Sequence, residues 1–389
     1  MRITTLKPFS KDEFESMGLL WHTDPDNTEY ISNELIQVSE SEADAYYDAC
    51  NELYDMYVEA ANYVIENNLF YELDIPNSLV DSIVQSFEED VHWHIYGRFD
   101  LAGGLDGTPI KLLEFNADTP TMLYESSAVQ YALLKANGYD GDSQFNNIYT
   151  AISQNFQRLI TLSDDVRNFH EIYEGWKILF SSIRGSTEEE RTVRFLQDMA
   201  HDAGLQTDFC YVDEVQLSPT DGIFYNDRNF EFWFKFIPWE NISIDEPELA
   251  LIINDIMANQ KAILLNPAYT ILFQSKRILK ILWDLYPNHP LLLETSYNPI
   301  NKKQVKKHAF GREGANVSIL DANGKPITIK DGEYENHKPI YQEFYPLNTH
   351  NGSFYQANVF FAFESCGLGF RKGSEIIDNY SKFVSHVIS

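Results

Sequence analysis

Basic residues are scarce in this chain of 389 residues, which has 29 Lys and Arg against 59 Asp and Glu and a formal net charge of −30. Binding to the phosphate backbone of DNA or RNA depends on clustered Lys and Arg that displace counterions. The charge balance therefore argues against a nucleic-acid partner. It leaves room for a cationic small molecule, because a negatively charged cleft concentrates cations.

Cysteines and long apolar runs are also scarce. Cys50, Cys210 and Cys366 lie far apart and form no CxxC pair, so neither a disulfide framework nor a zinc ribbon is expected. No apolar run approaches the ~18 residues that cross a bilayer, and the N-terminus has no signal-peptide core. We therefore expect a cytoplasmic protein with no membrane partner.

The pattern of apolar residues predicts a mixed α/β fold with two or three domains. Helical spacing covers residues 41–68, with Ser39 or Ser41 as the cap, and then 119–137, 188–203, 247–258 and 274–285. Short apolar runs predict strands at 176–182, 209–212 and 230–237, and further strands within 305–329 around a turn at Asn323-Gly324. Residues 176–212 therefore resemble a βαβ unit.

A hairpin over residues 91–116 carries the most informative side chains. If its turn is centred on Asp106-Gly107, Arg98 lies opposite Asn116 and Asp100 lies opposite Glu114. Two facing carboxylates repel each other by roughly 0.2 to 1 kcal/mol, so something should compensate them. Two carboxylates and a carboxamide suit Mg²⁺ when phosphate and water complete its shell. An exposed strand face with a simple Arg–Asp pair explains the pattern equally well.

Thr119-Pro120 predicts the start of a helix directly after the second strand, with a cap followed by proline. The free N–H groups of such a helix would form an anion pocket, to which the hydroxyls of Thr119 and Thr121 could contribute. Plain helix capping explains Thr119 and Pro120 by itself. Thr121 has no structural role in that simpler interpretation.

The loop Gly311-Arg312-Glu313-Gly314 follows Lys307 between two expected strands, as a flexible phosphate-covering loop would. It matches neither the Walker P-loop nor the dinucleotide fingerprint, so an ordinary glycine turn remains an alternative. His92 and His94 share a strand face, but no third nitrogen or sulfur ligand lies near them in the sequence. Many carboxylates and aromatic residues leave a two-carboxylate glycoside hydrolase as the alternative from another class.

Several segments together resemble the synthetase domain of the glutathionylspermidine synthase family, a branch of ATP-grasp carbon–nitrogen ligases. The segments are RFD at 98–100, LEFNADTPT at 113–121, KFIPWE at 235–240, KKHAFGREGANVS at 306–318, IYQEFYPL at 340–347 and GLGFR at 367–371. They span most of the chain in order. The length leaves no room for the amidase domain that some members carry, so hydrolysis of the product is not expected.

The resemblance implies that ATP and two Mg²⁺ ions are the cofactors and assigns roles to individual residues. The implied metal ligands are Asp100, Glu114 and Asn116. The implied charge-stabilising residues are Arg98 and Arg371. The implied ATP-binding residues are Lys276, Lys307, Gly311, Gly314, Gln342, Glu343 and Tyr345. The implied substrate-binding residues are Thr119, Thr121, Glu188 and Glu189. Glu188 and Glu189 would face the amine, although acidic residues are ordinary at a helix start.

The resemblance also implies an ATP-grasp-type ligase in three parts. Residues 1–170 would hold the N-terminal helices and the catalytic hairpin, residues 171–260 a βαβ-like substrate region, and residues 261–389 the nucleotide-binding region with a lid at about 290–338. The expected reaction joins a peptide or amino-acid carboxylate to a cationic amine or polyamine. Differences from the family at Phe236, His308 and Glu313 leave the identity of both substrates open. A nucleotide-dependent peptide- or polyamine-binding protein without turnover is a further alternative.

Overall fold

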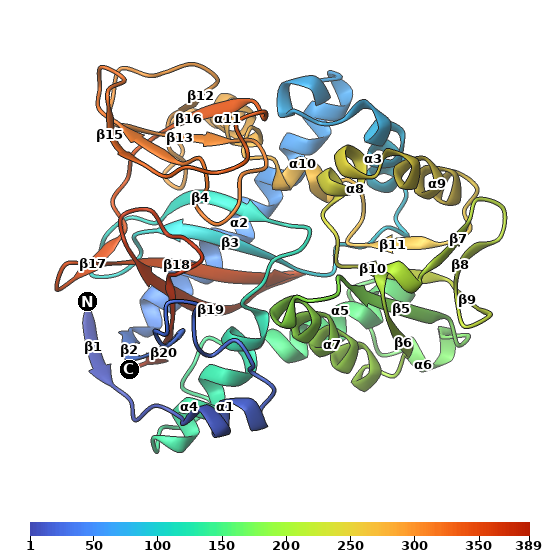
Figure 1. The fold of residues 1–389 in the computed structure, drawn as a ribbon, viewed down its shortest axis with the longest axis horizontal. Helices are drawn as coiled ribbons and strands as arrows, with labels where there is room; N and C mark the ends of the chain where they lie inside the picture. The colour runs from blue at the N-terminus through green and yellow to red at the C-terminus, as the bar shows by residue number, and fades with distance from the viewer.

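The computed structural model describes residues 1–389 and contains four β-sheets with helices packed around them (Figure 1). The α/β class predicted from the sequence is confirmed. No helix combines the length and apolarity needed to cross a membrane.

An eight-stranded sheet forms the centre of the molecule, and all its strand pairs are antiparallel except β2 with β20. Its strands run in the order β1 (Arg2–Thr5), β2 (Ile31–Val38), β20 (Lys382–Ile388), β19 (Glu364–Gly373), β18 (Ser353–Ala362), β3 (Gly97–Ala102) and β4 (Lys111–Asn116), and β17 (Asn348–His350) pairs with β18. The sheet thus joins both ends of the chain to the hairpin β3–β4.

The long helix α2 (Glu40–Glu66) packs against β18 and β19 of this sheet (Figure 1). It begins where Ser39 and Glu42 form a reciprocal capping box, so the helix and its Ser39 cap are confirmed. Alternate residues of β18 belong to two separate apolar clusters, since Val359 faces one and Phe360 the other. The sheet is therefore buried on both faces.

A four-stranded parallel sheet lies beside the central one, in the order β11 (Ile263–Leu265), β10 (Phe232–Lys235), β5 (Lys177–Ser182) and β6 (Gln206–Tyr211). Helix α7 (Thr187–Asp202) connects β5 to β6, which confirms the predicted βαβ unit. The nearby elements are α5 (Ile148–Thr161), α6 (Phe169–Ile172), α8 (Trp239–Asp245), α9 (Pro247–Ala258) and a small sheet of β7 (Gln216–Ser218), β8 (Gly222–Tyr225) and β9 (Arg228–Phe230).

A five-stranded sheet stands over the β3–β4 end of the central sheet (Figure 1). Its order is β12 (Thr295–Ser296), β16 (Pro339–Glu343), β13 (Gln304–His308), β14 (Ser318–Leu320) and β15 (Pro326–Ile329). The remaining elements are α1 (Lys11–Ser16), the 3₁₀ turns Phe70–Leu73, Asn77–Leu79 and Val212–Glu214, α3 (Val80–Glu88), the π-helical turn η3 (Glu125–Val129), α4 (Gln130–Ala136), α10 (Thr270–Gln274) and α11 (Ile278–Leu285).

Two predicted helices differ from the structure. The helix expected from Thr119 begins only at Leu123, because Met122 has a left-handed φ of 67° that a helix cannot contain. The helix expected over 274–285 is split between α10 and α11, since Ser275 is extended there and the N–H of Lys276 bonds to the carbonyl of Ala309 instead. The break fixes Lys276 against the five-stranded sheet.

Candidate active site

The hairpin β3–β4 has the predicted register, with Arg98 opposite Asn116 and Asp100 opposite Glu114. Asp106 and Gly107 both have positive φ, of 52° and 73°, as the tight turn requires. A β-bulge follows Asp100, so the pairing beyond it shifts by one residue. The four polar side chains therefore lie together at the end of the hairpin away from the turn.

Asp100 is buried and is surrounded by donors. It accepts bonds from Arg98 Nε at 2.8 Å, Arg98 Nη2 at 3.1 Å, Asn116 Nδ2 at 3.2 Å and Asn358 Nδ2 at 2.7 Å. Asn358 lies opposite it on the neighbouring strand β18. Arg98 is thus the counterion of Asp100. Burial lowers the pKa of this guanidinium, but Asp100, with smaller effects of Glu114 and Tyr30, outweighs burial and raises it.

Glu114 is compensated by lysines instead. Its Oε2 lies 3.1 Å from Nζ of Lys276, which also donates to the carbonyl of Gly311 at 2.7 Å. Burial alone would raise the pKa of Glu114, but Lys276 and Lys307 outweigh it and lower this pKa to about 2. Burial in turn lowers the pKa of Lys307 to about 8. Each of the two facing carboxylates therefore has its own cation, Arg98 for Asp100 and Lys276 for Glu114, and these cations offset the repulsion between them.

Asp100, Glu114 and Asn116 could hold Mg²⁺ only if oxygens from a bound nucleotide and water completed its coordination shell. Nδ2 of Asn116 lies 3.2 Å from Asp100 and 3.5 Å from Glu114 Oε1, so the three side chains converge. No group of three or more His, Cys, Asp or Glu side chains is arranged to hold a metal. Two carboxylates and one carboxamide leave half of an octahedron to phosphate and water oxygens, as is usual for Mg²⁺ with nucleotides.

One cavity is lined by every site residue that the resemblance implied. Its wall includes Arg98, Asp100, Glu114, Asn116, Thr119, Thr121, Glu188, Glu189, Lys276, Lys307, Gly311, Gly314, Gln342, Glu343, Tyr345 and Arg371. These residues come from the central sheet, the five-stranded sheet, helix α7 and the loops between such elements. The structure brings them together, whereas their individual roles stay predictions.

The cavity wall has two electrostatic ends. Cations gather beside the hairpin, where Lys276 and Lys307 flank Glu114. Carboxylates gather beside α7, where burial raises the pKa of Glu188 against the opposing effects of Thr121 and Arg371. Burial and the neighbouring Glu188 also raise the pKa of Glu189. The same cavity can therefore accept an anion at one end and a cation at the other.

Thr119 and Thr121 do not cap a helix, so the anion pocket expected at a helix N-terminus is absent there. Both residues lie in the loop between β4 and Leu123. The carbonyl of Thr121 accepts a bond from Arg98 Nη1 at 2.9 Å, and its hydroxyl faces Glu188. The loop thereby connects the arginine of the hairpin to the carboxylates of α7.

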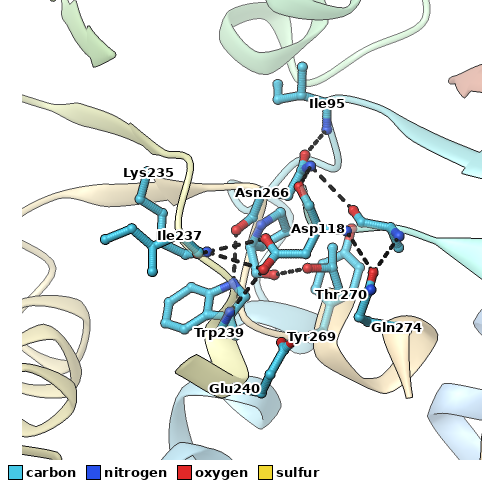
Figure 2. Close-up of polar contacts among 12 residues, drawn as sticks. Ile95, Asp118, Lys235, Ile237, Trp239, Glu240, Asn266, Tyr269, Thr270 and Gln274 are labelled. Atoms are coloured by element: carbon cyan, nitrogen blue, oxygen red, sulfur yellow. Dashed lines mark hydrogen bonds and ion pairs between the residues drawn. The ribbon is translucent and has the colours of Figure 1, made fainter. Parts of the chain in front are cut away.

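The loop after β4 is held by a buried polar network (Figure 2). Oδ1 of Asn266 accepts the N–H of Ile95 at 2.8 Å, and its Nδ2 donates to the carbonyl of Asp118 at 2.8 Å. Gln274 accepts the N–H of Ala117 at 3.0 Å. The amide side chains thus satisfy the main chain where the hairpin ends, and this satisfaction fixes the path of the loop.

An ion pair lies at the centre of this network (Figure 2). Lys235 Nζ is 3.1 Å from Asp118 Oδ1, and the two side chains are 0% and 1% exposed. Asp118 also accepts the N–H of Trp239 at 2.9 Å. Burial raises the pKa of Asp118 and lowers the pKa of Lys235, which is the usual cost of taking charges out of water.

The glycine loop is fastened to the body of the molecule by a second ion pair. Arg312 Nη2 lies 2.6 Å from Oε1 of Glu240 on α8. Gly314 has a φ of 69°, and a Cβ there would lie 2.5 Å from the carbonyl oxygen of Ile377, so only glycine fits. The pair Arg312–Glu240 therefore closes the loop over the cavity.

Breaking this pair is expected to weaken binding of the ATP that the resemblance implies. A hydrogen bond to a charged group contributes about 1.5 to 3 kcal/mol, so Glu240→Gln should raise the KM for ATP by at least about tenfold and change kcat less. Steady-state kinetics with varied ATP measures the effect. The matched control is Glu335→Gln, an exposed residue that forms no ion pair. Equal KM values for Glu240→Gln and the wild type would rule out a closing role.

The implied ATP-binding residues Gln342, Glu343 and Tyr345 have different surroundings. The side chain of Gln342 accepts from Lys307 Nζ at 2.9 Å and donates to the carbonyl of Leu112 at 3.1 Å. It therefore orients Lys307 as well as lining the cavity. Glu343 pairs with Lys302 at 3.1 Å, and Tyr345 lies near Lys111 at the rim.

The sequence analysis did not identify several residues at or near the cavity. Tyr30, Gln356, Glu375 and Asn379 line it. Asn358 donates to the lining residue Asp100, and burial and the charge of the lining residue Glu188 raise the pKa of Glu125. For Glu125 and Asn358 a signal was present, because each is a polar residue on an otherwise apolar pattern. Glu125 precedes Val129 and Leu133 at helical spacing, and Asn358 directly precedes the apolar run at 359–363.

The chain matches a known family over its full length. The family described as glutathionylspermidine synthase preATP-grasp matches residues 1–389. A Haemophilus influenzae protein provisionally named an acid–amine ligase is 30% identical over 377 residues, which cover 93% of this chain and 91% of that protein. The bifunctional glutathionylspermidine synthetase/amidase of Escherichia coli is 24% identical over 357 residues, which cover 83% of this chain and 54% of that protein.

Among solved structures, the fold resembles a glutathione synthetase-like effector from Globodera pallida. The TM-score is 0.56 at 10% sequence identity, and the alignment covers 92% of this chain and 89% of the other. This likeness concerns the fold alone. The chain spans about half the length of the Escherichia coli relative, so the activities of that whole protein do not transfer directly.

Proposed function

The chain belongs to the glutathionylspermidine synthase family of amide-forming ligases, and from this premise we propose that it is an ATP-dependent carbon–nitrogen ligase. Its substrates would be the carboxylate of a peptide or amino acid and a cationic amine. The observation that carries the proposal is one cavity with Lys276 and Lys307 at one end and, at the other, the two carboxylates of α7 that line it, which form no ion pair. An acid–amine ligase that uses ATP must bind the phosphates and the amine in the same cavity, because the activated acid reacts with the amine there.

The proposed first step activates the acid. A carboxylate oxygen of the acid attacks the γ-phosphorus of ATP, the bond from that phosphorus to the bridging oxygen breaks, and ADP leaves. Arg98 and Arg371, on the adjacent wall of the cavity, would stabilise the charge that develops on the phosphoryl oxygens. Lys276 and Lys307 would hold the phosphates.

The proposed second step forms the amide. The amine nitrogen attacks the acyl carbon, a carbon–nitrogen bond forms, and the carbon–oxygen bond to phosphate breaks. An ammonium substrate loses two protons overall, of which the leaving phosphate takes one. Glu188 and Glu189 would attract the cation and orient it toward the acyl group.

Asp100, Glu114 and Asn116 are the residues that would hold Mg²⁺. When bound, the metal would neutralise phosphate oxygens and so lower the barrier to phosphoryl transfer. Arg98 and Lys276 now pair with the two carboxylates. These same cations would be available to phosphate once a metal took their place beside the carboxylates.

We also propose the division of labour along the chain. Residues 1–170 would supply the hairpin, residues 171–260 the amine side of the cavity, and residues 261–389 the nucleotide side. The sheet that includes residues 295–329 would act as the lid, with Lys307 and the glycine loop on its inner side. Lys307 shares the cavity with Asp100 and Glu114, which supports this arrangement.

The ionisation of Glu114 argues against the glycoside hydrolase alternative. A glycoside hydrolase that used Glu114 as its acid would need a raised pKa there to protonate the leaving group, yet the pKa of Glu114 is lowered to about 2. A binding protein without turnover would have the same cavity. Only measurement of product separates it from a ligase.

A nucleotide-induced thermal shift is the expected first result. A ligand at about 100 times its Kd stabilises the folded state by about 2.7 kcal/mol, so ATP with Mg²⁺ should raise the unfolding temperature measurably. A screen of short peptides and amines for ADP release, with mass spectrometry, should then yield an adduct one water lighter than acid plus amine. A shift without ADP release from any pair would favour the binding protein, and no shift would contradict both.

A further inference from the structure

The start of α8 contacts two loops that border the cavity, the glycine loop and the loop after β4, residues 117–122. The N–H of Trp239 donates to Oδ2 of Asp118, in the loop after β4, at 2.9 Å. The next residue, Glu240, lies with its Oε1 2.6 Å from Nη2 of Arg312 in the glycine loop. Two adjacent residues of α8 therefore link the two loops.

The segment that joins α10 to α11 forms a second link between the same loops. Oε1 of Gln274 accepts the N–H of Ala117, in the loop after β4, at 3.0 Å. Two residues later, Nζ of Lys276 donates to the carbonyl of Gly311, in the glycine loop, at 2.7 Å. The two loops are far apart in the sequence, yet they are held together at two separate places.

Both links are buried, so their polar contacts cannot be exchanged for contacts with water without cost. Gln274 and Lys276 are 6% and 7% exposed, and Glu240 is 4% exposed. Oε2 of Glu240 has no hydrogen-bond partner, so Arg312 provides the only hydrogen bond of that side chain. Figure 2 shows where Trp239 and Gln274 meet the loop after β4. Moving either loop alone would leave buried groups unsatisfied.

The charges around α8 balance only while the glycine loop is docked. Lys235 pairs with Asp118 at 3.1 Å, and Arg312 pairs with Glu240. If the glycine loop moved away with Arg312, two buried carboxylates would share one lysine, which is unfavourable in a buried site. Burial first, and the charge of Glu240 as well, already raise the pKa of Asp118. Undocking would therefore disturb Asp118 and, with it, the loop after β4.

We propose that the glycine loop and the loop after β4 dock as one unit, so that the nucleotide and the acid bind cooperatively. The inference rests on the proposed function, since it takes ATP and the acid as the ligands beside these loops. Asp118, Glu240 and Gln274 would be positioning residues, because they act on the ligands through the two loops.

The proposal has a consequence for the order of events in the cavity. The glycine loop carries Gly311 and Gly314 on the nucleotide side, and the loop after β4 carries Thr119 and Thr121 on the acid side. A nucleotide held under the docked glycine loop would fix the two threonines before the acid arrives. By linkage, the bound acid would strengthen nucleotide binding by the same factor. The cavity would then hold ATP most tightly when an acid is present to be activated.

Hydrogen–deuterium exchange measured by mass spectrometry tests the coupling without an acid. The probe is Mg²⁺ with AMP-PNP, an ATP analogue that does not transfer its γ-phosphate. In the wild type, a saturating concentration of the probe should slow amide exchange in residues 308–318. It should also slow exchange in residues 117–122 by at least about fivefold, the lower end of typical couplings between sites.

Two variants break the links one at a time. Glu240→Gln removes the charge that holds Arg312, and Gln274→Met removes the acceptor of the Ala117 N–H at nearly the same length. Each should reduce the slowing in 117–122, and the double variant should lose it, while the slowing in 308–318 persists at saturation. The matched control is Glu246→Gln directly after α8, an exposed residue without an ion pair, which should behave as the wild type.

The outcomes separate this inference from the proposed function. Slowing in 308–318 of the wild type without slowing in 117–122 would overturn the coupling and leave nucleotide binding intact. No slowing in either segment would contradict nucleotide binding and the coupling with it. Undiminished slowing in 117–122 of the double variant would show that the two links carry no coupling. Exchange in β5 and β6 checks that each variant is folded. If the double variant is not, slowing equal to the wild type in both single variants would overturn the proposal.

Discussion

Glu114→Gln is expected to lower the rate of ADP formation with acid and amine on the order of 10³-fold, the loss typical when one preorganised charge is removed from an active site. Lys276 and Lys307 keep Glu114 fully ionised, so the substitution removes a whole charge with almost no change in shape. The fold should survive. Lys276 keeps its bond to the carbonyl of Gly311, and the unfolding free energy should fall by no more than about 1 to 3 kcal/mol.

ADP release and urea unfolding, measured on the same preparations, test this expectation. Glu294→Gln is the control, because Glu294 pairs with Lys302 and lies outside the cavity wall. Its rate should stay within about threefold of the wild type, as is usual for a surface pair worth less than ~1 kcal/mol. Wild-type turnover in Glu114→Gln would remove Glu114 from the proposed metal site.

Asp100→Asn is a less clean probe of the same site. Relief of repulsion between facing carboxylates would predict little change in stability. In the structure, however, Asp100 is the counterion of Arg98, which is itself buried. Removing it leaves a buried guanidinium without its partner, so loss of activity in Asp100→Asn would be mixed with loss of stability.

Lys235→Met is expected to destabilise the protein by about 3 to 5 kcal/mol, the usual result of leaving one member of a buried ion pair alone. Asp118 would then be a buried carboxylate whose only strong partner is the N–H of Trp239. Urea unfolding followed by circular dichroism measures the change. Part of the loss should disappear at low pH, since a protonated Asp118 carries no charge to bury.

The double variant Lys235→Met with Asp118→Asn separates charge from packing. Asparagine keeps an acceptor for Trp239 and needs no counterion, so the double variant should be more stable than Lys235→Met alone. If both variants lose the same stability, the loss comes from the packing of the Lys235 side chain against Trp239, over whose ring its Nζ lies at 4.2 Å. The surface substitution Lys261→Met serves as the matched control.

The parts of the site that are local in sequence could be predicted. Alternation and a tight Asp106-Gly107 turn are sufficient to set the register of β3 and β4, which places Asp100 opposite Glu114. The βαβ unit follows from equally local patterns. Both succeed because the deciding contacts lie within a few tens of residues.

The remaining features depend on contacts between distant segments. Asp118 meets Lys235 across 117 residues, and Asp100 meets Asn358 across 258. The helix expected from Thr119 begins only at Leu123, because Met122 has a left-handed φ of 67°, and the polar network that holds the preceding residues Ala117 and Asp118 comes from positions 266 and 274. Such long-range partners leave no periodic trace in a single sequence.

The place of β20 in the central sheet has a consequence for how the chain folds. Strand β2 pairs with β20, some 350 positions further along, while β5 and β6 pair within a single βαβ unit. During synthesis the parallel sheet can form as soon as its own segment emerges, but the central sheet stays open at β2 until the last strand arrives. Closing it demands a large loss of chain entropy, so we expect a slow final folding step and an exposed β2 edge until then.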